Sequence, residues 1–118
     1  MSMKRVTLVL RHGPESDLGV REMIDMAMVL ATFECPVTLV IQDAGVLWST
    51  LPSFPEGHPH SITGRLKSLP LYDVETILIS QEALDAFAIQ PAASFPGHAV
   101  EPAIIEAALS NADVVLEA

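Results

Sequence analysis

Apolar residues along the chain follow two kinds of pattern. Short, almost uninterrupted apolar runs occur at residues 5–10, 37–41 and 74–79. Such runs are typical of strands that are buried on both faces of a parallel sheet. Residues 18–32 instead repeat their apolar positions at helical spacing; these positions are Met23, Ile24, Ala27, Leu30 and Ala31. Pro36 prevents that helix from continuing, so the chain is predicted to begin strand, helix, strand.

Beyond the second strand the predicted elements become shorter. In order, they are a short element of undefined type at 46–48, a helix capped by Ser61 and stopped at Pro70, the third strand, helical turns at 81–87, a fourth strand at 98–101, a helix opening at Pro102, and a terminal strand at 113–117. Pro102 suits a first helical turn, and Asn111 suits the end of that helix. Residues 51–60 contain three prolines and are expected to form a loop.

Strands that alternate with helices indicate an α/β fold. We expect one domain over residues 1–118, built on an open, mostly parallel sheet of about five strands with helices on both faces and a flavodoxin-like layering. The sequence contains no internal repeat.

Composition narrows the class of partner. Hydrophobic residues make up 50% of the chain but aromatic residues only 5%, and the formal net charge is −9. No Lys or Arg follows Lys67. An acidic protein repels phosphate backbones, so direct nucleic-acid binding is not expected. The apolar surplus of so small a domain favours subunit contacts.

The single cysteine, Cys35, excludes an internal disulfide and a Cys-rich metal site. No apolar run reaches the ~20 residues that span a bilayer, and no secretory signal pattern is present, so we expect a cytoplasmic protein. We expect no cofactor and no bound metal. His58 and His60 are interpreted as loop histidines, because no Cys stands near them and the closest carboxylate is Glu56.

Arg11-His12-Gly13 directly follows the first predicted strand. A strand followed by Arg-His-Gly resembles the opening of the histidine phosphatase superfamily, in which the His accepts a phosphoryl group. That chemistry needs a second His and a second Arg around one phosphate, and Arg65 and His98 are the candidates left. A polar loop at a strand end is the simpler interpretation, so a His12 phosphohydrolase remains an alternative.

Two further residues are weighed as functional or structural. Cys35 stands where a helix ends, and the negative end of the helix dipole and Glu34 both oppose thiolate formation. We therefore interpret it as a small apolar side chain, with a persulfide carrier as the alternative. Trp48, the sole tryptophan, is equally compatible with an exposed interface anchor and with a core residue.

Five stretches in order along the chain resemble the TusC/DsrF subunits of the DsrE/F-like sulfur-relay proteins. They are Met3-Lys4-Arg5-Val6 with the following strand, Arg21-Glu22 with Asp25, Asp43-x-Gly45-Val46, Leu71-Tyr72-Asp73-Val74-Glu75, and Asn111-x-Asp113-Val114-Val115-Leu116. The resemblance implies a parallel sheet of about five strands and assembly with TusB/DsrH-like and TusD/DsrE-like sister chains. It also implies that Ser80 stands where the TusD/DsrE-type subunit carries its persulfide cysteine.

A serine cannot hold a sulfane sulfur, because relay requires a thiolate that attacks a persulfide and is attacked in turn. We therefore expect a non-catalytic subunit of a sulfur-relay complex that serves tRNA 2-thiouridine synthesis or Dsr-type sulfur oxidation. It would form a hetero- or homo-oligomer and contact no membrane. The interface candidates are Met26, Val29, Trp48, Leu71 and Tyr72.

Overall fold

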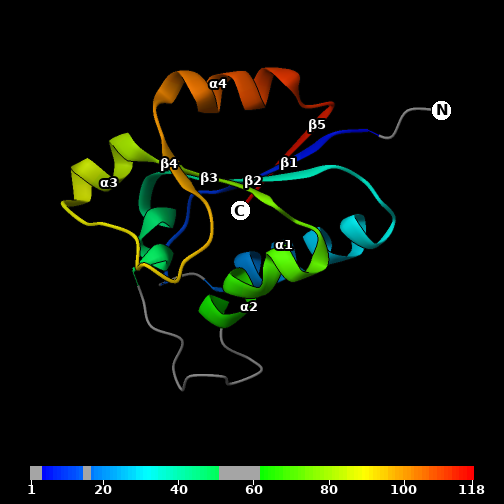
Figure 1. Cartoon of the computed structure of the whole chain (residues 1–118), viewed down its shortest axis with the longest axis horizontal. Coiled ribbons are helices and arrows are strands. Elements are labelled where there is room, and N and C mark those ends of the chain that lie inside the picture. The colour runs from blue at the N-terminus through cyan, green and yellow to red at the C-terminus, as the bar shows by residue number, and fades with distance from the viewer. Residues whose placement is uncertain (1–3, 15–16, 51–61) are drawn as a thin grey trace.

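The computed structural model describes residues 4–14, 17–50 and 62–118. Five parallel strands form one sheet in the order β4-β3-β2-β1-β5 (Figure 1). Their bounds are β1 Val6–Leu10, β2 Val37–Ile41, β3 Thr76–Ser80, β4 His98–Val100 and β5 Val114–Glu117. The predicted α/β fold with a parallel sheet is confirmed.

Helices cover the two faces of the sheet unequally. The α-helices are α1 Asp17–Thr32, α2 Ile62–Ser68, α3 Gln81–Phe87 and α4 Pro102–Asn111. Helices α1 and α2 lie together on one face and α4 lies alone on the other, whereas α3 projects from one end of the sheet (Figure 1). Two 3-10 helices, η1 Asp43–Ser49 and η2 Leu69–Tyr72, complete the described elements.

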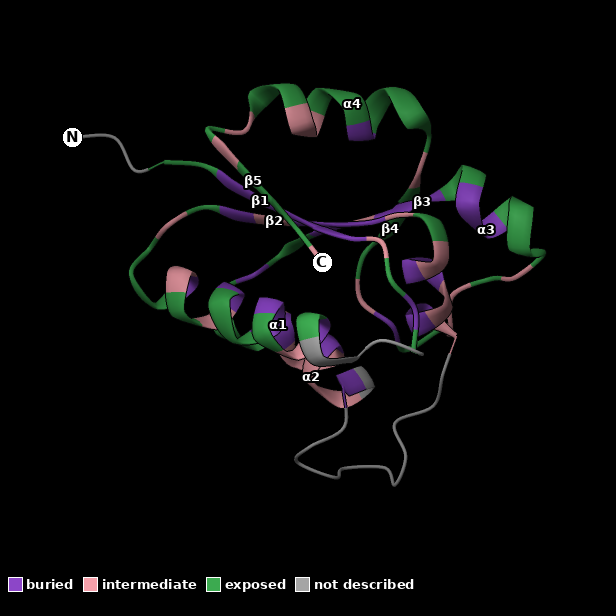
Figure 2. Ribbon diagram, turned by 180° about the vertical axis from the view of Figure 1, so that it is seen from behind, coloured by how far each residue is buried: buried purple, intermediate pink, exposed green. Residues whose placement is uncertain are grey.

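The core follows this division. Alternate strand residues point to opposite faces, and Leu8, Leu39 and Ile77 belong to the large cluster that also holds α1 residues such as Ile24. The opposite face has a much smaller buried cluster, Val9, Val40 and Ile105, with Leu78, Val100 and Leu109 packed against it. Figure 2 shows β1, β2 and β3 largely buried between the layers, while the edge strands β4 and β5 and the outer sides of α3 and α4 are mostly exposed.

The structure defines one element that the sequence left open, and two local predictions need correction. Residues 46–48 belong to the 3-10 helix η1. Pro70 does not end the helical segment, because it occupies an early position of η2, where the missing N–H breaks no hydrogen bond. The segment ends instead at Asp73, whose φ is 69°. Asn111 is the last helical residue of α4, and Ala112 after it is extended, so no left-handed cap forms. The loop 51–60 and Ser61 lie outside the described residues.

Gly45 in η1 allows a close approach to the end of β1. A Cβ built at this position would lie 2.3 Å from the backbone oxygen of Leu10 and 2.9 Å from its carbonyl carbon. Backbone atoms cannot move aside without disturbing the β1–β2 pairing. Gly45 is therefore required here for space, and it lets η1 pack directly against the carboxyl end of β1.

We expect Gly45→Ala to lower the free energy of unfolding by about 1–3 kcal/mol, the usual cost of overpacking. Gly19 in α1 is the matched control, because a Cβ there meets only the Cβ of Ala118, at 3.8 Å. Gly19→Ala should raise the free energy of unfolding by about 0.5–1 kcal/mol, since alanine is the better helix former. Urea denaturation of the two variants measures both effects, and similar unfolding midpoints for the pair would contradict the assignment.

Candidate functional site

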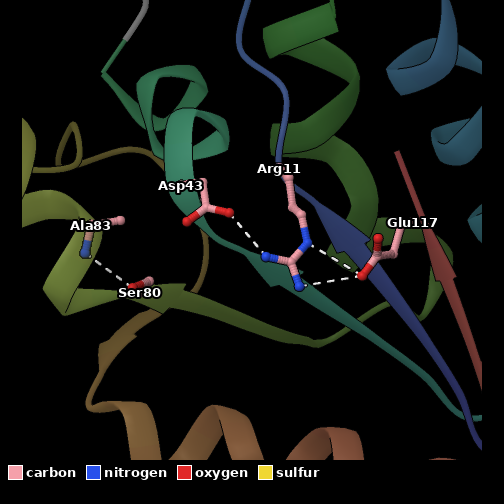
Figure 3. A network of polar contacts seen from close by, with 5 residues as sticks. All are labelled: Arg11, Asp43, Ser80, Ala83 and Glu117. Atoms are coloured by element: carbon pink, nitrogen blue, oxygen red, sulfur yellow. Dashed lines mark hydrogen bonds and ion pairs between the residues drawn. The ribbon is translucent and has the colours of Figure 1, made fainter.

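The carboxyl ends of parallel strands meet at one edge of a sheet, and ligands of open α/β sheets bind there. Arg11 follows β1, Asp43 opens η1 after β2, Ser80 ends β3 and Glu117 ends β5. Figure 3 shows these four side chains gathered at that edge. They form the polar part of the candidate site.

Arg11 joins two carboxylates from different strands. Its NH1 lies 2.9 Å from Oδ2 of Asp43, and its Nε and NH2 lie 3.3 and 3.2 Å from Oε1 of Glu117 (Figure 3). The hydrogen bond to Asp43 raises the pKa of Arg11 above its ordinary value, against the opposing effect of partial burial, and Glu117 adds to the rise. The guanidinium therefore stays charged and links the ends of β1, β2 and β5.

Backbone and indole hydrogen bonds reinforce the same edge. The amide of Arg11 donates to the carbonyl of Ala118 at 2.8 Å, and the amide of Gln42 donates to the carbonyl of Leu10 at 2.9 Å. Nε1 of Trp48 donates to the carbonyl of His12 at 2.8 Å. Trp48 is only 4% exposed, so its proposed role as an exposed anchor is wrong for this chain. The indole has a core position, and it fixes the loop after β1.

Ser80 acts as a helix cap. Its Oγ accepts a hydrogen bond from the amide of Ala83 at 3.0 Å, and the residue is only 7% exposed. A side-chain oxygen in this position satisfies one of the unpaired amides that open a helix. The hydroxyl at the end of β3 thus has a structural task, and no His is bonded to it among the contacts of the described chain.

A hollow of about 350 Å³ lies beside Ser80, between η1 and α3. Its lining combines polar and small apolar side chains: Gln42, Asp43, Ala44, Ser80, Glu82, Ala83, Ala86 and Phe87. The lining contains hydroxyl, amide and carboxylate groups but no thiol or imidazole. It can accept hydrogen bonds and positive charge, and it offers no nucleophile suited to sulfur transfer.

Cys35 lies at the other end of the sheet. It is the second residue before β2 and is partly buried, and its amide donates to the carbonyl of Leu30 at the end of α1. Ser80 ends the neighbouring strand β3 at the opposite edge. The thiol and the hollow beside Ser80 are therefore separated by the full length of the strands.

The residues of the phosphohydrolase hypothesis do not converge. His12 is exposed after β1. Nη1 of Arg65 instead pairs with Oδ1 of Asp25 at 2.9 Å, on the face of the sheet that α1 and α2 cover. His98 starts β4, which is three strand spacings from β1, or about 14 Å at about 4.8 Å per strand. One phosphate cannot contact all three side chains.

No group of three or more His, Cys, Asp or Glu side chains within residues 4–14, 17–50 and 62–118 is placed to hold a metal ion. His58 and His60 fall outside those ranges. In the same ranges, no helix has the length and apolar character needed to cross a bilayer.

Four interface candidates are exposed. Leu71 is 84% exposed, Val29 55%, Tyr72 50% and Met26 43%. Phe33, which sequence analysis missed, is 70% exposed; it follows the last residue of α1, and its spacing continues the helical face of Met26 and Val29. The spacing could have revealed Phe33, because it continues the outward positions 26 and 29 by one turn.

Comparison with known proteins supports the fold and the family resemblance. The model of the DsrE/DsrF-like family matches residues 4–117. The crystal structure of the ychN protein from E. coli is similar, with a TM-score of 0.80 at 18% sequence identity over 98% of this chain and 100% of that chain; at this identity the likeness concerns the fold. No curated protein shows significant similarity to this sequence.

We expect Ser80→Ala to lower the free energy of unfolding by about 1 kcal/mol, because the amide of Ala83 loses its acceptor. Ser80→Thr keeps an acceptor oxygen and serves as the control. Thermal and urea unfolding measure the difference, and equal stability of the alanine variant and the wild type would show that the cap contributes nothing.

Arg11→Gln should loosen the end of β5, because the charge that joins Asp43 and Glu117 is removed. Partly exposed ion pairs contribute about 0.5–1 kcal/mol, so we expect hydrogen exchange of the Ala118 amide to quicken about two- to fivefold. Arg11→Lys keeps the charge but not the branched geometry, so the exchange rate of its Ala118 amide should lie between those of the wild type and Arg11→Gln. Salt at about 1 M should reproduce much of the effect in the wild type; exchange that is insensitive to both changes would contradict this account.

Proposed function

This chain belongs to the DsrE/DsrF-like family, and on that premise we propose that it is a non-catalytic structural subunit of a cytoplasmic sulfur-relay complex of the TusC/DsrF type. Its sister chains are of the TusB/DsrH-like and TusD/DsrE-like types. The complex serves tRNA 2-thiouridine synthesis or Dsr-type sulfur oxidation.

The chemistry at the end of β3 is the main support. Sulfur relay needs a thiolate that accepts and then passes on a sulfane sulfur. At the carboxyl edge this chain has Ser80, whose oxygen caps α3. A hydroxyl at this point keeps the fold intact and forms no persulfide, which leaves sulfur handling to another chain.

Exposed apolar side chains give the second line of support. Val29 on α1, Phe33 directly after that helix, and Leu71 and Tyr72 in η2 are large and at least half exposed. Contact with another subunit removes such surface from water, at a gain of roughly 25 cal/mol per Å². We assign these residues to the contact with sister chains, and the net charge of −9 argues against direct contact with tRNA.

Co-expression with TusB-like and TusD-like chains should give an assembly that stays together in size-exclusion chromatography with light scattering. Val29→Glu combined with Leu71→Glu should release this chain as a folded monomer, because both side chains are exposed and their loss leaves the core unchanged. Ile104→Glu is the matched control, since Ile104 is 50% exposed but lies on α4, across the sheet. A wild-type chain that remains monomeric beside its sisters would refute the proposal.

Sulfur loading gives an independent test. After incubation with a persulfide donor, intact-mass measurement should show no added sulfur on the wild-type chain. A gain of one sulfur atom that disappears in Cys35→Ala would assign the chain to the persulfide carriers instead, despite the position of Cys35 at the amino end of β2.

A further inference from the structure

Helix α3 packs against β3 and η1 by one side and leaves its other side uncovered. It spans Gln81–Phe87, and only Ala83 and Leu84 of its residues are buried. It projects from the end of the sheet, away from α1 and α2 and near the start of α4 (Figure 1), and its outer side is exposed in the reverse view (Figure 2). No described element covers that outer side.

The exposed side of α3 and its surroundings carry negative charge. Glu82 and Asp85 lie on α3 itself, and Glu101 directly precedes α4; all three are exposed. Asp85 accepts a hydrogen bond from Nε2 of Gln81 at 2.8 Å, and no Lys or Arg follows Lys67 in the sequence. Among the described residues, no ion pair joins these three carboxylates to a Lys or Arg, whereas Asp25 and Asp43 are each paired with an arginine.

Three hollows border α3, and the two that Glu82 lines give this surface its shape. One, of about 350 Å³, lies between η1 and α3. The other, of about 310 Å³, lies between α3 and the start of α4 and is lined by Gln81, Glu82, Asp85, Glu101 and Pro102. Glu82 lines both hollows, so its carboxylate stands on the ridge between them.

An apolar side chain accompanies the charges. Phe87, at the end of α3, is 44% exposed and lines the first hollow together with Ala44, Ala83 and Ala86. The first hollow thus offers an aromatic ring and small apolar groups. The ridge and the second hollow offer carboxylates. An inorganic cation would leave the small apolar groups of the hollow uncovered, whereas a Lys or Arg side chain can use both its charge and its aliphatic stem.

We propose that the outer side of α3 and the two hollows that Glu82 lines dock a short basic segment of a partner protein, in which an apolar side chain stands between Lys or Arg residues. The apolar side chain packs on Phe87 and the cations pair with Glu82, Asp85 and Glu101. A seven-residue helix is about 10 Å long, so an extended segment of three or four residues spans it. This surface is distinct from the α1 and η2 side chains assigned to sister subunits, and the proposal stands without that assignment.

Fluorescence anisotropy with a labelled peptide of alternating Lys and Leu tests the proposal on the full chain. The variant Glu82→Gln, Asp85→Asn and Glu101→Gln removes the three charges while it keeps side-chain shape. We expect it to weaken peptide binding about tenfold, equivalent to ~1.4 kcal/mol. The control variant Glu22→Gln, Glu75→Gln and Glu106→Gln removes the same number of exposed carboxylates elsewhere and should weaken binding less than twofold.

The apolar contact is tested separately. Phe87→Ser should weaken the Lys–Leu peptide about threefold or more and leave an all-Lys peptide of equal charge unaffected. Equal losses in the two triple variants would mean that only net charge attracts the peptide, and would overturn the proposal. Self-association of the wild type that the α3 triple variant abolishes would assign the surface to a second copy of the chain and would overturn it as well.

Discussion

The position of β1 inside an all-parallel sheet, between two neighbouring strands, determines most of the molecule. This strand hydrogen-bonds with β2 on one side and β5 on the other, and Leu8, Val9 and Leu10 within it are fully buried. Because all strands run in the same direction, each chain segment that leaves the sheet does so at one edge. Arg11, Asp43, Ser80 and Glu117 therefore meet there although they are far apart in sequence. The polar network of that edge is a consequence of strand direction.

The unequal covering of the two faces explains where apolar surface remains. The face under α1 and α2 has enough helical material to bury a large cluster. The outward stripe of α1, formed by Met26 and Val29, is left exposed by the described elements. The opposite face depends on α4 alone and buries only a small cluster, so Ile104 remains half exposed. A domain of this size has limited core volume for a chain that is half hydrophobic. The exposed apolar surface thus follows from the composition, and surface of this kind is typical of contacts between subunits.

Local patterns in the sequence predict the elements well and the long-range contacts poorly. The bounds of β2 and α3 agree with residues 37–41 and 81–87, because apolar runs, spacing and Ser80 as a cap are encoded within a few residues. The bond between Arg11 and Glu117 joins residues 106 positions apart, and it depends on the strand order, which no local pattern specifies. Trp48 remained undecided for the same reason, since burial of an indole depends on whether its N–H finds an acceptor. The carboxyl-edge rule could have anticipated Arg11 near Asp43, as both follow adjacent strands.

The buried indole of Trp48 also gives the molecule an intrinsic fluorescence signal. Trp48 is the sole tryptophan, and its ring nitrogen is held by the carbonyl of His12, so its emission arises from one defined environment. That environment adjoins the carboxyl edge of the sheet, whereas the outward stripe of α1 faces away from the sheet. Native fluorescence therefore reports, without any label, on the packing of η1 against the loop after β1.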